Sequence, residues 1–111
     1  MAYTINGEAF DAPAPENVGG VTFVPVAKLV EGLGGYVTWN NATKVASLEL
    51  GDKKVDVEED NDTINVGGQT MTLSSRPSMG GGALWVPLDL FRDALGCTVE
   101  ENGSDISISN M

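Results

Sequence analysis

An internal repeat runs through this 111-residue chain at an offset of 62 residues. The stretches 23–40 and 85–102 align without a gap. Six of their 18 aligned positions are identical: Val24/Val86, Pro25/Pro87, Leu33/Leu95, Gly34/Gly96, Val37/Val99 and Asn40/Asn102. The proline, leucine and glycine matches have local reasons. Proline can begin a helix, leucine can form the buried side of the helix, and glycine can end it. The repeat predicts two copies of one strand-helix-strand unit.

The two copies, at about 3–58 and 59–110, are expected to form a single domain over residues 1–111. A unit of about 50 residues buries too little apolar surface to be stable alone, whereas a chain of this length buries roughly two thirds of its unfolded surface. We therefore expect the two units to combine their half-cores into one interior.

Local patterns favour short strands. Asn6-Gly7, between 3–5 and 8–10, predicts a type I′ hairpin, and the proline-bearing stretch 11–17 predicts an extended connector. Residues 18–24 are interpreted as one strand, and residues 46–58 as a hairpin with apolar side chains at alternate positions.

Each copy also predicts one two-turn helix, since Pro25 begins a run with leucine and valine at helical spacing that ends at Gly34-Gly35. With 16 Val and Ile residues against nine Leu, the composition leans toward sheet. We therefore expect an α+β fold, in which an antiparallel sheet of short strands curls against two short helices.

The charged residues exclude several classes of protein. The chain has 6 basic and 16 acidic residues, no histidine and one cysteine, and its formal net charge is −10. Catalytic triads and metal sites that depend on histidine are therefore impossible, and nucleic acid and anionic membranes are poor partners. No segment approaches the length of a membrane-spanning helix. We expect no enzyme activity, no cofactor and no membrane insertion.

Two groups of side chains are candidate binding residues. Tyr36 and Trp39 could stack on a ligand, although aromatic residues at these repeat positions can also be core or sheet-face residues. Asp56, Asp60 and Asp62 supply the hard oxygen ligands that Ca²⁺ prefers, but their spacing is not that of a calcium-binding loop. A solvated hairpin end is the alternative interpretation of this acidic run.

The single cysteine has no partner for an intramolecular disulfide. Cys97 follows the glycine that ends the second predicted helix, and its neighbours in sequence are not basic. A reactive thiolate needs a basic neighbour. We therefore expect Cys97 to pack as a small apolar side chain.

Motifs of one known family occur in both copies. They are Val24-Pro25, Leu33-Gly34, Trp39-Asn40 and Thr43-Lys44 in the first copy, and Trp85–Leu88 and Ala94–Gly96 in the second. With these motifs the chain resembles the copper amine oxidase N-terminal domain-like family, also described as a stalk domain, from Thr4 to Ser109. The resemblance is read as two tandem copies.

The resemblance implies a non-catalytic module of secreted or surface-attached bacterial proteins. It does not imply amine oxidation, because the oxidase's copper-binding histidines lie in a different domain and this chain has no histidine. We therefore expect an extracellular or cell-surface module that mediates attachment to a protein or a cell-wall polymer. One alternative is a self-assembling subunit of a surface layer or filament, which would pair its sheet edges. Another is a calcium-binding surface domain.

Overall fold

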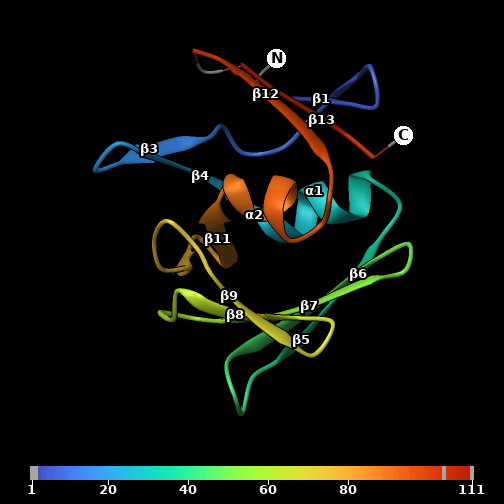
Figure 1. The fold of residues 1–111 in the computed structure, drawn as a ribbon. Helices are drawn as coiled ribbons and strands as arrows, with labels where there is room; N and C mark the ends of the chain where they lie inside the picture. Colours follow the sequence, from blue (N-terminus) through green and yellow to red (C-terminus); the bar gives the residue numbers. More distant parts are fainter. Residues whose placement is uncertain (1–2, 104, 111) are drawn as a thin grey trace.

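Strands dominate the fold, which is known from a computed structural model that describes residues 3–103 and 105–110 (Figure 1). Strands make up 53% of these residues and helices 11%. The expected α+β class is therefore wrong: the fold is mostly β, and the described residues form three sheets and two helices of seven and five residues. The helices are this short because Gly34 and Gly96, both with positive φ, follow them closely and the chain then returns to strand.

The elements of the described residues follow one another in a regular order. In the first half they are β1 (Tyr3–Ile5), β2 (Glu8–Phe10), β3 (Glu16–Val18), β4 (Val21–Pro25), α1 (Val26–Gly32), β5 (Tyr36–Asn40), β6 (Val45–Leu50) and β7 (Lys53–Glu58). In the second half they are β8 (Thr63–Val66), β9 (Gln69–Thr72), β10 (Ser78–Gly80), β11 (Ala83–Pro87), α2 (Asp89–Asp93), β12 (Thr98–Asn102) and β13 (Asp105–Ser109).

The two repeats meet in a central sheet with the order β10-β11-β4-β3. Its middle strands β4 and β11 are antiparallel, and Val24 lies opposite Val86, its equivalent in the repeat. On either side of the valines, Pro25 lies opposite Trp85 and Phe23 lies opposite Pro87. The repeat offset of 62 residues converts one of these two pairs into the other. A pseudo-twofold axis therefore passes between the two valines.

Each half of the central sheet is a hairpin with a two-glycine turn. Strands β3 and β4 flank Gly19-Gly20, and β10 and β11 flank Gly81-Gly82. All four glycines have positive φ, which a two-residue hairpin turn of type I′ requires. The prediction of one strand over residues 18–24 was wrong, because this turn divides the stretch between two strands.

The other two sheets flank the helices. One has the order β5-β6-β7-β8-β9 and is antiparallel throughout, and the other has the order β12-β13-β1-β2. In the second, β1 and β13 are parallel, which the sequence analysis did not predict. Figure 1 shows α1 and α2 between these two sheets, with β3, β4 and β11 beside them. The sequence predicted a single shared antiparallel sheet, whereas the described residues form three sheets.

One apolar cluster joins all three sheets and both helices. The cluster draws buried side chains from every sheet and from α1 and α2, among them Ile108, Val24, Val86, Leu48, Leu29, Leu90 and Phe91. Both repeats contribute to this cluster, in which α1 presents Val26, Leu29 and Val30. The single domain of two repeats stays a prediction.

The transition from α1 to β5 requires two glycines. Gly34 has a φ of 94°, which ends the helix in the left-handed region. A Cβ at Gly35 would collide with the carbonyl oxygen of Glu49 and would lie 2.8 Å from Cγ1 of Val30. Pro25 occupies the N-cap with an extended ψ of 109°, so it ends β4 and precedes the first helical residue.

Side chains also hold the first and last strands together. The Tyr3 hydroxyl donates to the carbonyl of Pro13 at 2.7 Å, which ties the connector to β1. The Asn110 backbone N–H donates to Oδ1 of Asn6 at 3.0 Å, and the side-chain Nδ2 of Asn110 donates to the carbonyl of Leu33. Asn6 and Gly7 have φ of 51° and 84°, which confirms the predicted turn.

Replacement of Val86 by alanine is expected to lower the free energy of unfolding by roughly 2 kcal/mol, because it removes fully buried methyl groups at the pseudo-twofold axis. The matched change Val18→Ala, on a side chain that is 58% exposed, should cost less than about 0.5 kcal/mol. Urea unfolding followed by circular dichroism measures both. Equal losses would contradict the central role of the Val24/Val86 pair.

Burial of Tyr3 raises the pKa of its phenol from 10.0 to about 12. Between these two pH values the native state keeps a proton that the unfolded state has lost, so stability falls as pH rises through this window. Tyr3→Phe should cost roughly 1 kcal/mol at pH 7 through the lost hydrogen bond, yet lose less stability than wild type between pH 10 and 12. Urea unfolding at several pH values tests this, and parallel pH profiles would contradict it.

Candidate functional site

The two predicted stacking residues lie on β5, an edge strand, but on opposite faces of its sheet. Tyr36 pairs with Glu49 on the outer face and is 71% exposed. Trp39 pairs with the buried Ala46 on the inner face and is 36% exposed. Side chains three residues apart in a strand point to opposite faces. The structure therefore does not bring the two rings together into one stacking surface.

Trp39 instead borders a groove of about 420 Å³. The groove lies between β5, helix α1 and the β10–β11 hairpin, and its apolar lining includes Val37, Ala27 and Met79. Lys28 and Glu31, both exposed on α1, also line it and supply polar groups of opposite charge. A concave apolar surface with a few polar groups is the usual form of a binding site.

A second pocket, of about 410 Å³, lies on the opposite side of the central sheet from the Val24/Val86 pair. Trp85 and Phe23, which are equivalent in the repeat, line it together with Val18, Met79 and Glu16. The Trp85 indole Nε1–H donates to the carbonyl of Gly80 at 3.0 Å, which holds the ring in place. We call this hollow the Trp85 pocket.

The three aspartates suggested for calcium serve the fold through separate contacts. Asp56, half-buried on β7, accepts a hydrogen bond from the Ser47 hydroxyl at 2.9 Å. The Asp60 backbone N–H donates to the carbonyl of Pro77, and the Asp62 carbonyl accepts from Leu73. Among residues 3–103 and 105–110, no three His, Cys, Asp or Glu side chains form a group that could hold a metal ion. The structure thus does not gather these carboxylates.

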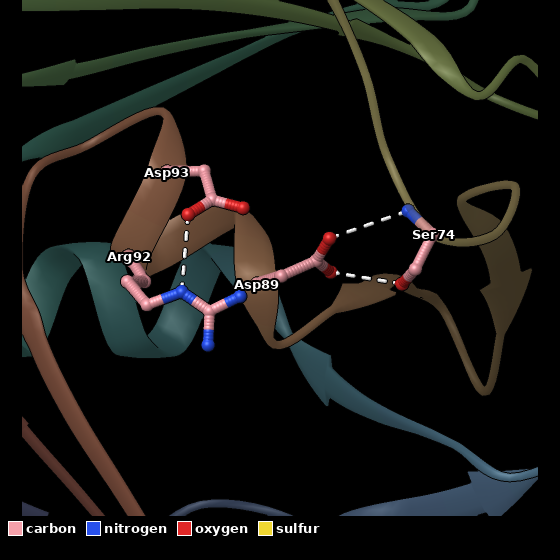
Figure 2. A network of polar contacts seen from close by, with 4 residues as sticks. All are labelled: Ser74, Asp89, Arg92 and Asp93. Carbon is pink, nitrogen blue, oxygen red and sulfur yellow. Dashed lines mark hydrogen bonds and ion pairs between the residues drawn. The ribbon is translucent and has the colours of Figure 1, made fainter.

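A polar network surrounds helix α2 (Figure 2). Both carboxylate oxygens of Asp89 accept from Ser74, one from its backbone N–H at 3.3 Å and one from its hydroxyl at 3.0 Å. Arg92 Nε donates to Asp93 at 3.0 Å, and this hydrogen bond, followed by the Asp93 charge, raises the pKa of the guanidinium. Figure 2 shows Asp89 directed toward Ser74, and the Arg92 and Asp93 side chains, which are 62% and 46% exposed, side by side. The Ser74–Asp89 hydrogen bonds tie the loop after β9 to α2, while the Arg92–Asp93 contact stays within the helix.

Cys97 is buried with 4% of its surface exposed, and burial raises the pKa of its thiol. It belongs to the apolar cluster of the core. The prediction that Cys97 packs as a small apolar side chain is therefore confirmed.

The Trp85 pocket and the groove beside Trp39 were not predicted from the sequence. Both depend on how the β10–β11 hairpin lies relative to distant strands, and Met79 of this hairpin lines both hollows. One signal was available: Phe23 and Trp85 are aromatic residues at equivalent repeat positions, next to the Val-Pro pair that both copies share. The opposite orientation of Tyr36 and Trp39 could also have been derived from their spacing.

Comparison with known proteins identifies one family. A model described as the copper amine oxidase N-terminal domain matches residues 4–110 as one continuous region. The two tandem copies of the family domain that the sequence suggested are not supported, because the single match spans both repeats. No curated protein matches the chain. Neither described helix has the length and apolar character of a membrane-crossing segment.

The burial of Cys97 predicts a slow thiol. Ellman's reagent should react with the native protein on the order of a hundredfold more slowly than with the urea-unfolded protein, because the native thiolate is disfavoured and inaccessible. The double variant Cys97→Ala/Thr98→Cys places the thiol at an exposed neighbouring position and should react rapidly in the native state. Similar native rates for Cys97 and the displaced thiol would contradict the burial.

Proposed function

The chain belongs to the copper amine oxidase N-terminal domain family, a non-catalytic domain, and we propose that it is an extracellular bacterial attachment module. Its ligand on this proposal is a neutral glycan of the cell wall, bound in the groove beside Trp39. The proposal joins the family membership to one local observation, the partly exposed indole ring at the border of an apolar groove.

The form of the groove supports a sugar ligand. Sugar rings present apolar C–H faces that pack on an aromatic ring, while their hydroxyls need hydrogen-bond partners at the edge. Trp39 supplies the ring, and Lys28 and Glu31 of α1 supply a donor and an acceptor at the same groove. Asp and Glu residues outnumber basic residues 16 to 6, so phosphate-rich wall polymers would be repelled and uncharged glycans would not.

A self-assembling subunit is the second candidate function. The observation in its favour is that β3 and β10 form the two edges of the central sheet, where, within the part of the chain that the structure describes, one side of each backbone has no strand partner. Such edges can pair with another chain. A net charge of −10 on every copy opposes this association, so glycan attachment is the function that we place first.

Co-sedimentation with purified peptidoglycan sacculi tests the attachment. Wild-type protein should be retained, and Trp39→Ala should reduce the affinity roughly threefold to tenfold through the lost stacking surface. Tyr36→Ala is the matched control, because it removes an aromatic ring from the same strand but from the opposite face. It should bind like wild type.

Two outcomes would contradict the proposed attachment: no retention of the wild-type protein, and equal loss of retention in the Trp39 and Tyr36 variants. Circular dichroism establishes that both variants are folded. Size-exclusion chromatography and negative-stain microscopy examine self-assembly separately. A single monomeric peak without fibres would exclude the second candidate.

A further inference from the structure

We propose that the Trp85 pocket binds a lysine or arginine side chain, presented by an extended segment of a partner protein. This goes beyond the attachment proposed above, because it assigns a second site on another sheet to a second class of ligand. Three properties of the pocket support this assignment: its aromatic walls, its charge and the two strand edges beside it, which pair with no further strand of the described residues.

The walls of the pocket come from equivalent positions in the two repeats. Phe23 and Trp85 are separated by 62 residues, as are Glu16 and Ser78, and each aromatic residue pairs across its hairpin with the polar one. The pocket therefore lies across the pseudo-twofold axis. The two halves differ, however, with Phe and Glu on one side and Trp and Ser on the other. Because of this difference the two ends of the pocket are not equivalent, and the Glu16 carboxylate lies at the end formed by β3.

The pocket's chemistry matches a long basic side chain. An ammonium or guanidinium group is attracted to the face of a tryptophan ring, and its methylene stem can pack on apolar groups. The indole of Trp85 is held by its bond to Gly80, and Val18 and Met79 supply exposed apolar surface, at 58% and 39% exposure. Among the described residues that line the pocket, Glu16 is the acidic one and none is basic.

The electrostatics of the whole chain favour the same ligand. With ten excess negative charges, the protein attracts a basic partner over a distance and repels an acidic one. Glu16 then places one negative charge at the pocket itself. A basic side chain is thus attracted both by the net negative charge of the protein and by Glu16 at the pocket.

The position of the pocket indicates how the side chain is presented. The pocket is bounded by β3 and β10, which are the two edge strands of the central sheet. An extended segment can pair with such an edge through its backbone while every second side chain points onto the face of the sheet. A segment added beside β3 or β10 would therefore direct a basic side chain toward Trp85.

A peptide titration followed by NMR tests the inference. The probe is a short capped peptide of alternating threonine and valine with one central lysine, and its matched partners carry norleucine or glutamate at the centre. The lysine peptide should bind roughly threefold to tenfold more tightly than the norleucine peptide, and the glutamate peptide should not bind. The shifts should centre on the Trp85 indole N–H, which a Trp39→Phe variant assigns, and on the amide of Gly80.

Variants then separate a specific site from general charge attraction. Glu16→Gln should weaken lysine-peptide binding roughly threefold to fivefold, whereas Glu8→Gln, which removes another exposed carboxylate away from both hollows, should leave it nearly unchanged. Trp85→Leu keeps an apolar wall without the aromatic face and should weaken binding similarly. Well-dispersed spectra establish that each variant is folded, and Glu16→Gln provides a test that does not alter the sheet's aromatic residues.

The inference is overturned if the norleucine peptide binds as tightly as the lysine peptide, if both glutamine variants weaken binding equally, or if the shifts lie away from Trp85. Failure here and failure of glycan attachment are distinguishable, because Trp39→Ala changes the sacculus assay and leaves the Trp85 pocket intact. Conversely, Glu16→Gln should not alter retention on sacculi.

Discussion

The antiparallel pairing of β4 with β11 determines the rest of the arrangement. Because Val24 lies opposite its own repeat equivalent, the two hairpins that contain these strands become the two halves of one sheet. Each strand then leads into a helix, and the two helices enter the common apolar cluster. The pairing also brings Phe23 and Trp85 onto the same face of the sheet. Core and surface pocket thus arise on the two sides of one strand pair.

Local features of the sequence were predicted well because short-range rules govern them. Asn6-Gly7 forms its hairpin turn, α1 ends at a left-handed Gly34, and Cys97 is buried. The fold class was predicted wrongly because two helices of five and seven residues carry too little of the chain, and because Gly19-Gly20 makes a turn where one strand was expected. The parallel pair of β1 and β13 could not be derived from local pattern, since it joins residues about one hundred positions apart.

The candidate site was harder to predict than the local structure. Tyr36 and Trp39 were correctly placed on one strand, but a separation of three residues directs their rings to opposite faces. The aspartates were close in sequence, yet Asp56 bonds to Ser47 and the backbones of Asp60 and Asp62 hold the segment before β10. Both hollows depend on which strands lie beside Met79: β3 and β4 of its own sheet form the Trp85 pocket, and α1 and β5 form the groove beside Trp39. This is a property of tertiary packing alone.

The parallel ladder between β1 and β13 has a mechanical consequence. Tyr3 lies beside Ile106 and Ile5 beside Ile108, so the strand nearest the N-terminus and the strand nearest the C-terminus run side by side in one direction. A tensile force applied through Tyr3 and Ser109 would pull the two strands along their length in opposite directions. All the rungs between them would then share the load in shear and would not open one at a time. The geometry is suited to a module that must stay folded under tension.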